Sequence, residues 1–492
     1  MSVIDIDSVP ASYINNVGYA AGDDLPRING AIQMAKEIAA TGDIGIIRVP
    51  HDLHITFLRD SMGNLPRKVK VGQYIETPGI FIDESRIQFV MENDAKIIVD
   101  SIAPDLPGSE HYCACILGRD LYTNPQWDSG AAGHYDLIPY LEHNAFINLS
   151  LDGTPLTVDE RLRMLGAISG GLAITRARHG QVAKLRIKNL NGFTGGLTSH
   201  VANEIFQFYD IDVQQDRVNG ARHGNSVWID GGQKLSVVKV RVSGGVNGII
   251  VARNNDANRN GDDNLMMDAE ARDCGSGISF TGSYNKISQS KTYLCGAGVT
   301  FVAGHGNMVN DLEIHNEGHP SNAGVFTGIE LRNNAAFPVK NNRVSGVKMF
   351  RVQRGVVLRS TASLNDFRDV EIDAQFFHPA TNAPNYGAVI LNEAPLSAGN
   401  TFARIKANGT DVDALLKAKL LDVNHRETLQ QIMARIESEQ GAEALAQYLN
   451  TTTAADIARL NVEKSLTEMY ETNNPAHQVA TLMAQPIIEA LT

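Results

Sequence analysis

Acidic, basic and aromatic residues that suit carbohydrate chemistry recur on a set of short strands that begin near glycine. Trp228 offers a flat surface on which a sugar ring can stack, while Asp230 and Glu330 are acids at outward-facing positions of these strands. Two carboxyl groups that flank a glycosidic bond can supply the acid, base or nucleophile for hydrolysis or transfer. Arginines that can hold carboxylates or hydroxyls occur on or beside the same strands: Arg253, Arg332 and Arg359.

Elimination or epimerisation of a uronic acid needs a different set of residues, a base and a cation close to the sugar carboxylate. His223 is the candidate base, with Arg222 and Lys286 as candidate cations. A polar loop from His315 to His319 supplies His319 as a further substrate-binding candidate, although the same composition is typical of a solvated turn. The residue types therefore leave hydrolysis, transfer and elimination open.

The segment 256–262 matches the first half of a calcium-binding loop, because oxygen-bearing side chains alternate along it before a glycine. Met267 stands where such a loop normally ends in an acid, and a turn rich in Asn and Asp has the same composition. Calcium is the one cofactor that the sequence suggests, and Asp262 and Asp263 are also candidate catalytic acids. The candidate metal ligands are Asp256, Asn258, Asn260 and Asp262.

The strands that position these residues belong to a repeat. Asparagines align in six strands with spacings of 21, 22, 35, 23 and 35 residues, and the positions two, five and seven residues later are nearly all apolar. One side of each strand therefore faces a core. The six asparagines are Asn264, Asn285, Asn307, Asn342, Asn365 and Asn400, and the same template extends back to Asn144, Gly180, Phe206 and Leu235, so that ten coils share one sheet.

Charge alternates along this predicted sheet. The residue six positions after each template start changes sign from coil to coil without exception over nine coils. Stacked parallel strands lie about 4.8 Å apart, so each charge has neighbours of opposite sign, and we interpret the row as a lock on strand register rather than a binding surface. The row reads Arg186, Asp212, Arg241, Glu270, Lys291, Glu313, Lys348, Glu371 and Lys406.

The glycine-led strands form a second predicted sheet, and its outward face is chemically uneven. Longer loops flank it at 214–225, 252–263, 316–327 and 374–386, which favours this face as the binding surface. Asp230 and Glu330 stand four coils apart, or about 19 Å, so they cannot form one catalytic pair in a single subunit. Asp230 would need Asp262, Asp263 or an acid from a neighbouring subunit.

The N-terminal region resembles the opening of pectate-lyase-like β-helix proteins. An amphipathic helix over 24–41 precedes a strand that ends in Val49-Pro50, and the resemblance covers about residues 15–410. It implies an all-β fold, a right-handed parallel β-helix with an N-terminal capping helix and a C-terminal α-helical segment. Members of this superfamily include lyases, hydrolases, epimerases and fructotransferases that act on carbohydrates, and phage tailspikes.

Two short motifs resemble those of polygalacturonase-type hydrolases, namely Asp262-Asp263 and Gly304-His305-Gly306. They lie two coils apart here, and the Asn-Thr-Asp motif of that family has no counterpart. We therefore expect His305 to be a turn residue.

We expect three regions along the chain. Residues 1–50 form the cap helix and first strand, residues 51–409 form the parallel β-helix, and residues 410–492 form helices that cap the open end or mediate assembly. A homo-oligomer is the expected assembly.

The composition excludes several classes of partner. A formal net charge of −12 disfavours nonspecific binding to nucleic acid or anionic lipid, and no apolar run is long enough to cross a bilayer. The first residues lack the cationic and apolar regions of a secretion signal, so we expect a cytoplasmic, phage-borne or leaderless-secreted protein.

The leading hypothesis from the sequence is an enzyme that cleaves or rearranges an oligo- or polysaccharide on the glycine-led face, as a lyase, a glycoside hydrolase or a glycosyl transferase. The rival is a glycan-binding protein with little or no catalysis, such as a tailspike or an adhesin. Product analysis separates the two, because only the enzyme releases reducing ends or unsaturated products.

Overall fold

The computed structural model forms two compact units, residues 1–290 and 291–492, which are described separately. Of the 492 residues, it describes all except 18, 59–67, 72–73, 104–109, 129–133, 191, 201–202, 253–261, 317–325, 333–337, 375–387, 393, 395–397, 408–409 and 412–492. The predicted helical C-terminal segment therefore lies outside the described residues, except for a short strand at its start.

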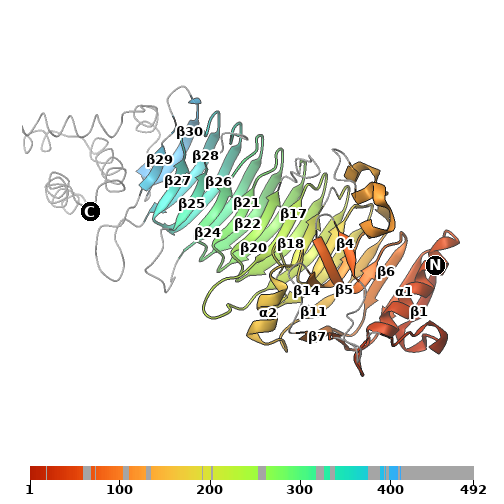
Figure 1. Cartoon of the computed structure of the whole chain (residues 1–492). Helices are drawn as coiled ribbons and strands as arrows, with labels where there is room; N and C mark the ends of the chain where they lie inside the picture. The colour runs from red at the N-terminus through yellow and green to blue at the C-terminus, as the bar shows by residue number, and fades with distance from the viewer. Residues whose placement is uncertain are drawn as a thin grey trace, which may run out of the picture. The chain divides into compact units, whose positions relative to one another are not determined.

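Parallel strands are the main regular secondary structure of the first unit (Figure 1). Its asparagine-led sheet contains β1 (Ser2–Asp5), β2 (Gly45–Val49), β3 (Leu53–Phe57), β6 (Ile87–Met91), β7 (Ile97–Ile102), β10 (Ala145–Ile147), β11 (Ser150–Asp152), β14 (Gln181–Lys188), β16 (Gln207–Gln214), β18 (Ser236–Ser243) and β20 (Leu265–Arg272). Its glycine-led sheet contains β4 (Val69–Val71), β5 (Tyr74–Ile82), β8 (Glu110–Leu117), β12 (Leu172–Thr175), β15 (Leu197–His200), β17 (Asn225–Asp230), β19 (Asn247–Ala252) and β21 (Ser276–Phe280). All pairs among them are parallel except β4 with β5.

The second unit repeats both sheets. Its asparagine-led strands are β24 (Met308–His315), β26 (Arg343–Val352), β28 (Asp366–Ala374) and β30 (Thr401–Ala407), and β31 (Thr410–Asp411) pairs antiparallel with β30. Its glycine-led strands are β23 (Ala297–Phe301), β25 (Thr327–Leu331), β27 (Arg354–Leu358) and β29 (Ala388–Asn392). β22 (Lys286–Tyr293) contains the boundary between the units. The predicted all-β parallel architecture is confirmed.

Helices and short 3-10 turns are few. They are α1 (Leu25–Ala40), α2 (Val158–Met164), η1 (Ile6–Ser8), η2 (Ala11–Tyr13), η3 (Leu121–Thr123), η4 (Pro125–Asp128) and η5 (His134–Leu137), and a small separate sheet pairs β9 (Leu141–Glu142) with β13 (Ala177–Arg178). No helix within the described ranges has the length and apolar character that crossing a bilayer requires.

α1 covers the start of the first unit, next to β1 and β2 (Figure 1). Leu25, Ile28 and Ile32 on its predicted stripe are buried. A side chain at Gly45 would place its Cβ 2.8 Å from the Ala35 carbonyl oxygen, so the close approach of helix and strand requires glycine there. The helix thus shields the first strands from solvent, as a cap must.

Stacked asparagines hold successive rungs together at one corner. In the second unit, the Asn342 side-chain oxygen accepts from the backbone N–H of Asn307 at 2.9 Å and from its amide at 3.0 Å. Asn365 and Asn400 repeat both contacts with the rung before each, and all four asparagines are buried. The predicted amide ladder is confirmed, and it satisfies polar groups that the turn would otherwise bury unpaired.

A left-handed residue bends the asparagine-led strands. The residue four positions after the template start has φ between 51° and 62° in nine coils: Lys184, Asp210, Lys239, Asp268, Gln289, Asp311, Gly346, Asp369 and Arg404. This residue has no register partner, and the side-chain alternation changes phase across it. The bend explains why apolar residues lie at positions two, five and seven, which no single flat strand could bury together.

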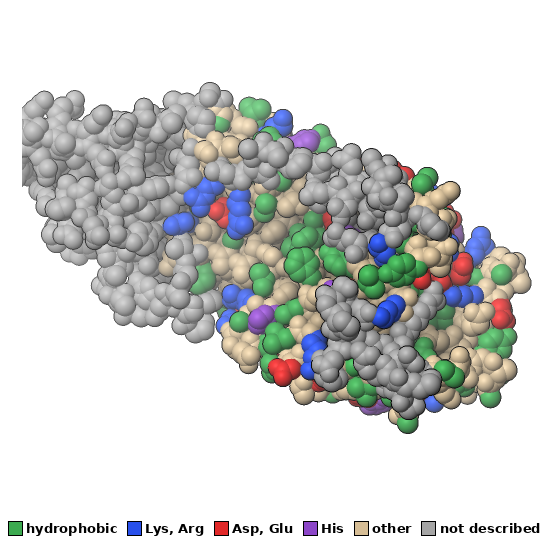
Figure 2. Space-filling model, in the orientation of Figure 1, with side chains coloured by type: hydrophobic (Ala, Val, Ile, Leu, Met, Phe, Trp, Pro, Cys, Tyr) green, Lys and Arg blue, Asp and Glu red, His purple; other side chains and the backbone are tan. Residues whose placement is uncertain are grey.

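Ion pairs run along the bent strands. Arg186 and Arg241 each contact the left-handed aspartate of the following rung, with Nη2 to Oδ1 distances of 3.0 Å to Asp210 and 2.7 Å to Asp268. In the second unit, Lys291 Nζ lies 2.7 Å from Glu313. These pairs of mixed sign suit a register lock better than a site for a polyanion. The face of the molecule in Figure 2 likewise carries charged side chains of both signs.

A glutamate, Glu76, is buried on the glycine-led sheet. Glu76 on β5 is fully buried, and its carboxylate accepts from the Ile168 backbone N–H at 2.7 Å. Burial raises the pKa of Glu76 to about 8, although the hydrogen bond from Ile168 opposes the shift. Val69, Val71 and other apolar residues cluster around the neighbouring strands.

Replacement of Asn365 by alanine should cost about 2–4 kcal/mol of stability, because it leaves the backbone N–H and the side-chain amide of Asn342 without their shared acceptor. Denaturant unfolding measures the loss. Asn15→Ala, which removes an exposed asparagine, is the control and should change stability by less than about 0.5 kcal/mol. Equal effects of the two substitutions would contradict a stabilising role for the ladder.

Glu76→Gln should remove a pH dependence of stability. The folded-state pKa of about 8 lies above the ordinary glutamate value of 4.5, so the stabilisation from the bound proton is complete below about pH 4.5 and is lost as pH rises through 8. The thermal midpoint of Glu76→Gln should therefore exceed that of the native chain by a margin that widens from pH 5 to 8. Glu37→Gln, on the exposed side of α1, is the control, and its difference in thermal midpoint from the native chain should not change with pH. A pH-independent difference for Glu76→Gln as well would refute the raised pKa of Glu76.

Candidate functional site

The outward face of the glycine-led sheet in the first unit brings an aromatic side chain next to an acid. Trp228 and Asp230 alternate with inward residues along β17. Across the strands, Trp228 pairs in register with Thr198 and Ile250, and Asp230 with Ala252. Both predicted residues therefore share one surface, although Trp228 is only partly exposed and its indole N–H is buried with no acceptor among the described residues.

A buried histidine contacts this acid. His200 Nδ1 lies 2.6 Å from Asp230 Oδ2, and the two residues are 3% and 8% exposed. When Nδ1 donates its proton to the carboxylate, Nε2 carries the lone pair, which is the tautomer that a general base uses. Nε2 has no hydrogen-bond partner in the described part of the chain, and the ring of Tyr74 stands edge-on at a centroid distance of 5.9 Å.

His200 was not among the sequence candidates. It ends β15, whose sequence GGLTSH from Gly195 begins with glycine like the other strands of this sheet. The spacing of the glycine-led strands could have revealed His200. If β15 had been counted among these strands, its register with β17 would have placed His200 in the same row as Asp230.

A second cluster lies on the glycine-led sheet of the other unit. Glu330 Oε1 accepts from Arg359 Nη2 at 3.0 Å, and Oε2 accepts from Arg332 Nε at 3.0 Å. Burial raises the pKa of the Glu330 carboxyl, but hydrogen bonds and charge from Arg332 and Arg359 outweigh burial, so its pKa is lowered. The cluster is an ionised acid between two cations, which suits binding of an acidic group better than donation of a proton.

The two acids proposed as partners of Asp230 lie elsewhere. Asp263 is exposed with φ of 58°, in the corner row that also contains Lys234, and it directly precedes the ladder residue Asn264. Asp262 is partly exposed, and its Oδ1 accepts from the Ser283 backbone N–H at 3.1 Å. Both residues therefore belong to the turn that enters β20 rather than to the face of Asp230.

The predicted base and cations for elimination do not converge with Asp230. His223 Nε2 lies 3.3 Å from the Val218 carbonyl oxygen beside a cavity of about 10 Å³, and Arg222 Nη2 lies 2.7 Å from Asp273 Oδ1. Lys286 begins β22, on the asparagine-led sheet. These positions disfavour an elimination site built from His223.

Several candidates lie outside the described residues: Arg253, His319, Asp256, Asn258 and Asn260. Of the predicted calcium ligands, the structure describes only Asp262. No group of three or more His, Cys, Asp or Glu side chains that could hold a metal occurs in the described ranges.

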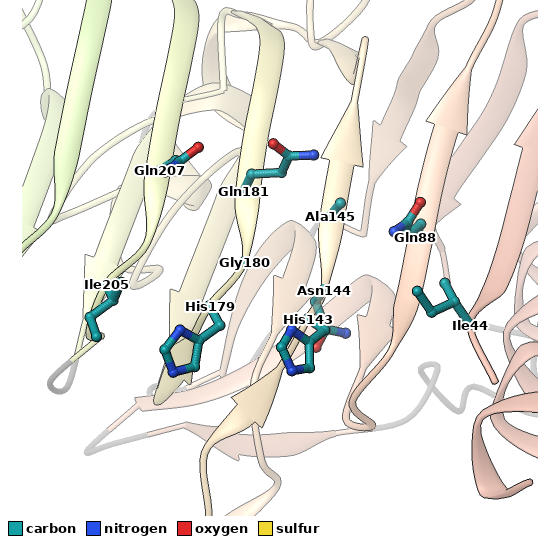
Figure 3. Close-up of a pocket in the computed structure, with 10 residues that line it drawn as sticks. All are labelled: Ile44, Gln88, His143, Asn144, Ala145, His179, Gly180, Gln181, Ile205 and Gln207. Atoms are coloured by element: carbon teal, nitrogen blue, oxygen red, sulfur yellow. The ribbon is translucent and has the colours of Figure 1, made fainter. Parts of the chain in front are cut away.

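An open cavity of about 420 Å³ lies on the asparagine-led side of the first unit (Figure 3). Gln88, Ala145, Gln181 and Gln207 cross four neighbouring strands in one row. His143 and His179 stand below this row, with stacked rings at a centroid distance of 5.9 Å (Figure 3). None of these residues was a sequence candidate. Neutral amides carry no catalytic signal, and His143 and His179 lie in turns before asparagine-led strands, away from the predicted binding face.

A family model described as "Right handed beta helix region" matches residues 225–403. The strands of this stretch pair in parallel within each unit. The chain is a right-handed parallel β-helix. A search of curated proteins finds no sequence match.

Solved structures with the same fold extend the similarity over most of the β-helix. A double mutant of the tailspike protein of E. coli bacteriophage HK620 is 11% identical, with a TM-score of 0.53, over 81% of this chain and 66% of the tailspike, just under two thirds. DFA-IIIase from Arthrobacter chlorophenolicus A6 is 13% identical, with a TM-score of 0.51, over 82% of this chain and 94% of that enzyme. At these identities the likeness establishes the fold of the β-helix. Its activity must be inferred from the residues of the site.

Glu330→Gln should destabilise the β-helix at neutral pH, because it removes the carboxylate that Arg332 and Arg359 share. The folded-state pKa of Glu330 is lowered, so its stabilisation is present above the ordinary glutamate pKa of 4.5 and is lost as pH falls through the lower folded-state pKa. Thermal midpoints should differ at pH 7 and converge towards pH 3. Glu371→Gln, an exposed acid of the asparagine-led sheet, is the control with a small effect, and a Glu330→Gln difference that stays constant with pH would contradict the ion-pair role.

Proposed function

We propose that this β-helix acts on an oligo- or polysaccharide bound to the outward face of its glycine-led sheet. The observation that carries the proposal is the surface formed by Trp228 and Asp230, with His200 bonded to the acid at 2.6 Å. An aromatic platform beside a carboxylate and an imidazole provides both a stacking surface for a sugar ring and a group that can transfer a proton.

Ligands of the structural neighbours support a carbohydrate. The HK620 tailspike is known in complex with a pentasaccharide, and DFA-IIIase in complex with DFA-III. Such proteins share the fold with this chain, and fold alone does not fix an activity. The proposal for this chain therefore rests on its own residues.

In the proposed reaction, Asp230 holds the His200 ring so that Nε2 is the proton acceptor. Nε2 is buried, so the step requires a local movement that admits a sugar hydroxyl or water to it. Cleavage by hydrolysis or transfer then needs a second acid that protonates the leaving oxygen. Asp262 and Asp263 do not share the face of Asp230. We propose that this acid comes from a flanking loop or from a neighbouring subunit of a homo-oligomer, with residues 410–492 as the assembly or capping segment.

Glycan binding without turnover is the second candidate function. Two observations favour it: His200 and Asp230 are both buried, and Glu330 already bonds two arginines. In this case Trp228 binds the glycan by stacking, and the buried His200–Asp230 pair takes no part in proton transfer.

The two functions are separated by incubating the full chain with neutral glycans, fructans and uronic-acid polymers. Hydrolysis gives new reducing ends, elimination gives an unsaturated product with ultraviolet absorbance, and transfer gives products of altered chain length. Asp230→Asn should abolish turnover while affinity is retained, because it removes the charge that orients His200. Binding with no product from any glycan would favour the second candidate.

Trp228→Ala should weaken glycan affinity about 3–10-fold through loss of stacking. Tyr284→Ala, which removes an exposed aromatic side chain at a turn of the asparagine-led sheet, is the matched control and should leave affinity unchanged. Unchanged affinity in Trp228→Ala would rule out this face as the binding surface.

A further inference from the structure

The row of glutamines above the cavity in Figure 3 has one gap. Gln88 and Gln181 are the register partners of Ala145 on its two sides, and Gln207 follows Gln181. Ala145 thus replaces a long amide side chain by a methyl group in the middle of the row. The resulting volume of about 420 Å³ lies within the range of about 300–1,000 Å³ that small-molecule sites have.

The asparagine ladder breaks at the same place. Asn144 is 2% exposed and lines the cavity, but its side-chain Oδ1 has no hydrogen-bond partner in the described residues, unlike Asn342 or Asn365. The next rung carries Gly180 where the ladder would have an asparagine. A Cβ at Gly180 would lie 2.4 Å from the Phe206 ring and 2.6 Å from the Asn144 carbonyl oxygen, so only glycine fits. The cavity therefore lies beside a buried, unpaired acceptor.

The lining of the cavity is uncharged apart from its histidines. Amides of Gln88, Gln181 and Gln207 both donate and accept hydrogen bonds, and Ile44 and Ile205 supply apolar surface. The charged side chains next to it in sequence pair with each other, because Arg178 Nε lies 2.6 Å from Glu142 Oε1. A phosphate or carboxylate would find no fixed cation here.

We propose that this cavity is a second carbohydrate site, which binds one or two rings of a neutral oligosaccharide on the asparagine-led side of the β-helix. Hydroxyl groups match amides that donate and accept, and the apolar face of a sugar ring matches Ile44 and Ile205. The site is separate from the face of Trp228 and does not depend on turnover there. The second site would hold a long glycan on the asparagine-led side of the first unit, whereas the proposed reaction takes place on the glycine-led face.

Saturation-transfer NMR on the full chain tests the proposal in a Trp228→Ala background, in which binding to the glycine-led face is weakened. Neutral malto- and fructo-oligosaccharides are the probes, and trigalacturonate is the charged comparison. Ala145→Gln restores the glutamine row and fills the gap, so the affinity for a neutral probe should fall at least about tenfold. Ser236→Gln is the matched control, because Ser236 occupies the same row one rung beyond Gln207, outside the cavity.

The expected result is binding of a neutral oligosaccharide to Trp228→Ala and to its Ser236→Gln derivative, and its loss in the Ala145→Gln derivative. Gln181→Leu, which removes an exposed amide at nearly constant size, should also weaken binding and covers the case in which Ala145→Gln does not fold. Equal binding of trigalacturonate, unchanged affinity in both cavity variants, or no neutral binding to Trp228→Ala would overturn the second site. The last result would leave the proposed function at Trp228 intact.

Discussion

Each rung of this β-helix must lie directly over the previous one, because parallel strands satisfy their backbone groups only through the neighbouring rung. The corners are the difficult part, since a buried turn has donors that no strand partner reaches. Asn342, Asn365 and Asn400 solve this by accepting from the backbone N–H and the side-chain amide of the asparagine one rung before. Where the amide is missing, at Gly180, a ring from Phe206 packs against the backbone instead.

The stacking also decides which residues can act together. Residues at equivalent positions of neighbouring rungs lie in one row, whereas residues far apart in the same row cannot meet at one bond. His200 and Asp230 are on adjacent strands and touch, and Glu330, Arg332 and Arg359 meet for the same reason. Chemistry on this fold is therefore local to one or two rungs, and a longer ligand must bind along the row.

The repeat in the sequence predicted the fold well, because register, core positions and the amide ladder all follow from spacing. It did not predict the bend at Asp210 and its equivalents, since a left-handed residue leaves only a change of phase in the apolar pattern. For the site, the pattern placed Asp230 and Trp228 on one face but missed His200, whose strand was left out of the glycine-led set. Asp263 was selected because it is acidic, but it lies in a turn. Gln181 was not selected, because a neutral amide does not indicate a site.

The unequal spacing of the ladder asparagines shows how such a protein can change without losing its fold. Rungs of 21 to 35 residues carry the same ladder and the same inward positions. β24 and β26, like β28 and β30, pair in the template register although 35 residues separate their asparagines. Loops of different length and composition can therefore be exchanged between rungs, so that recognition can diversify while the backbone scaffold stays constant.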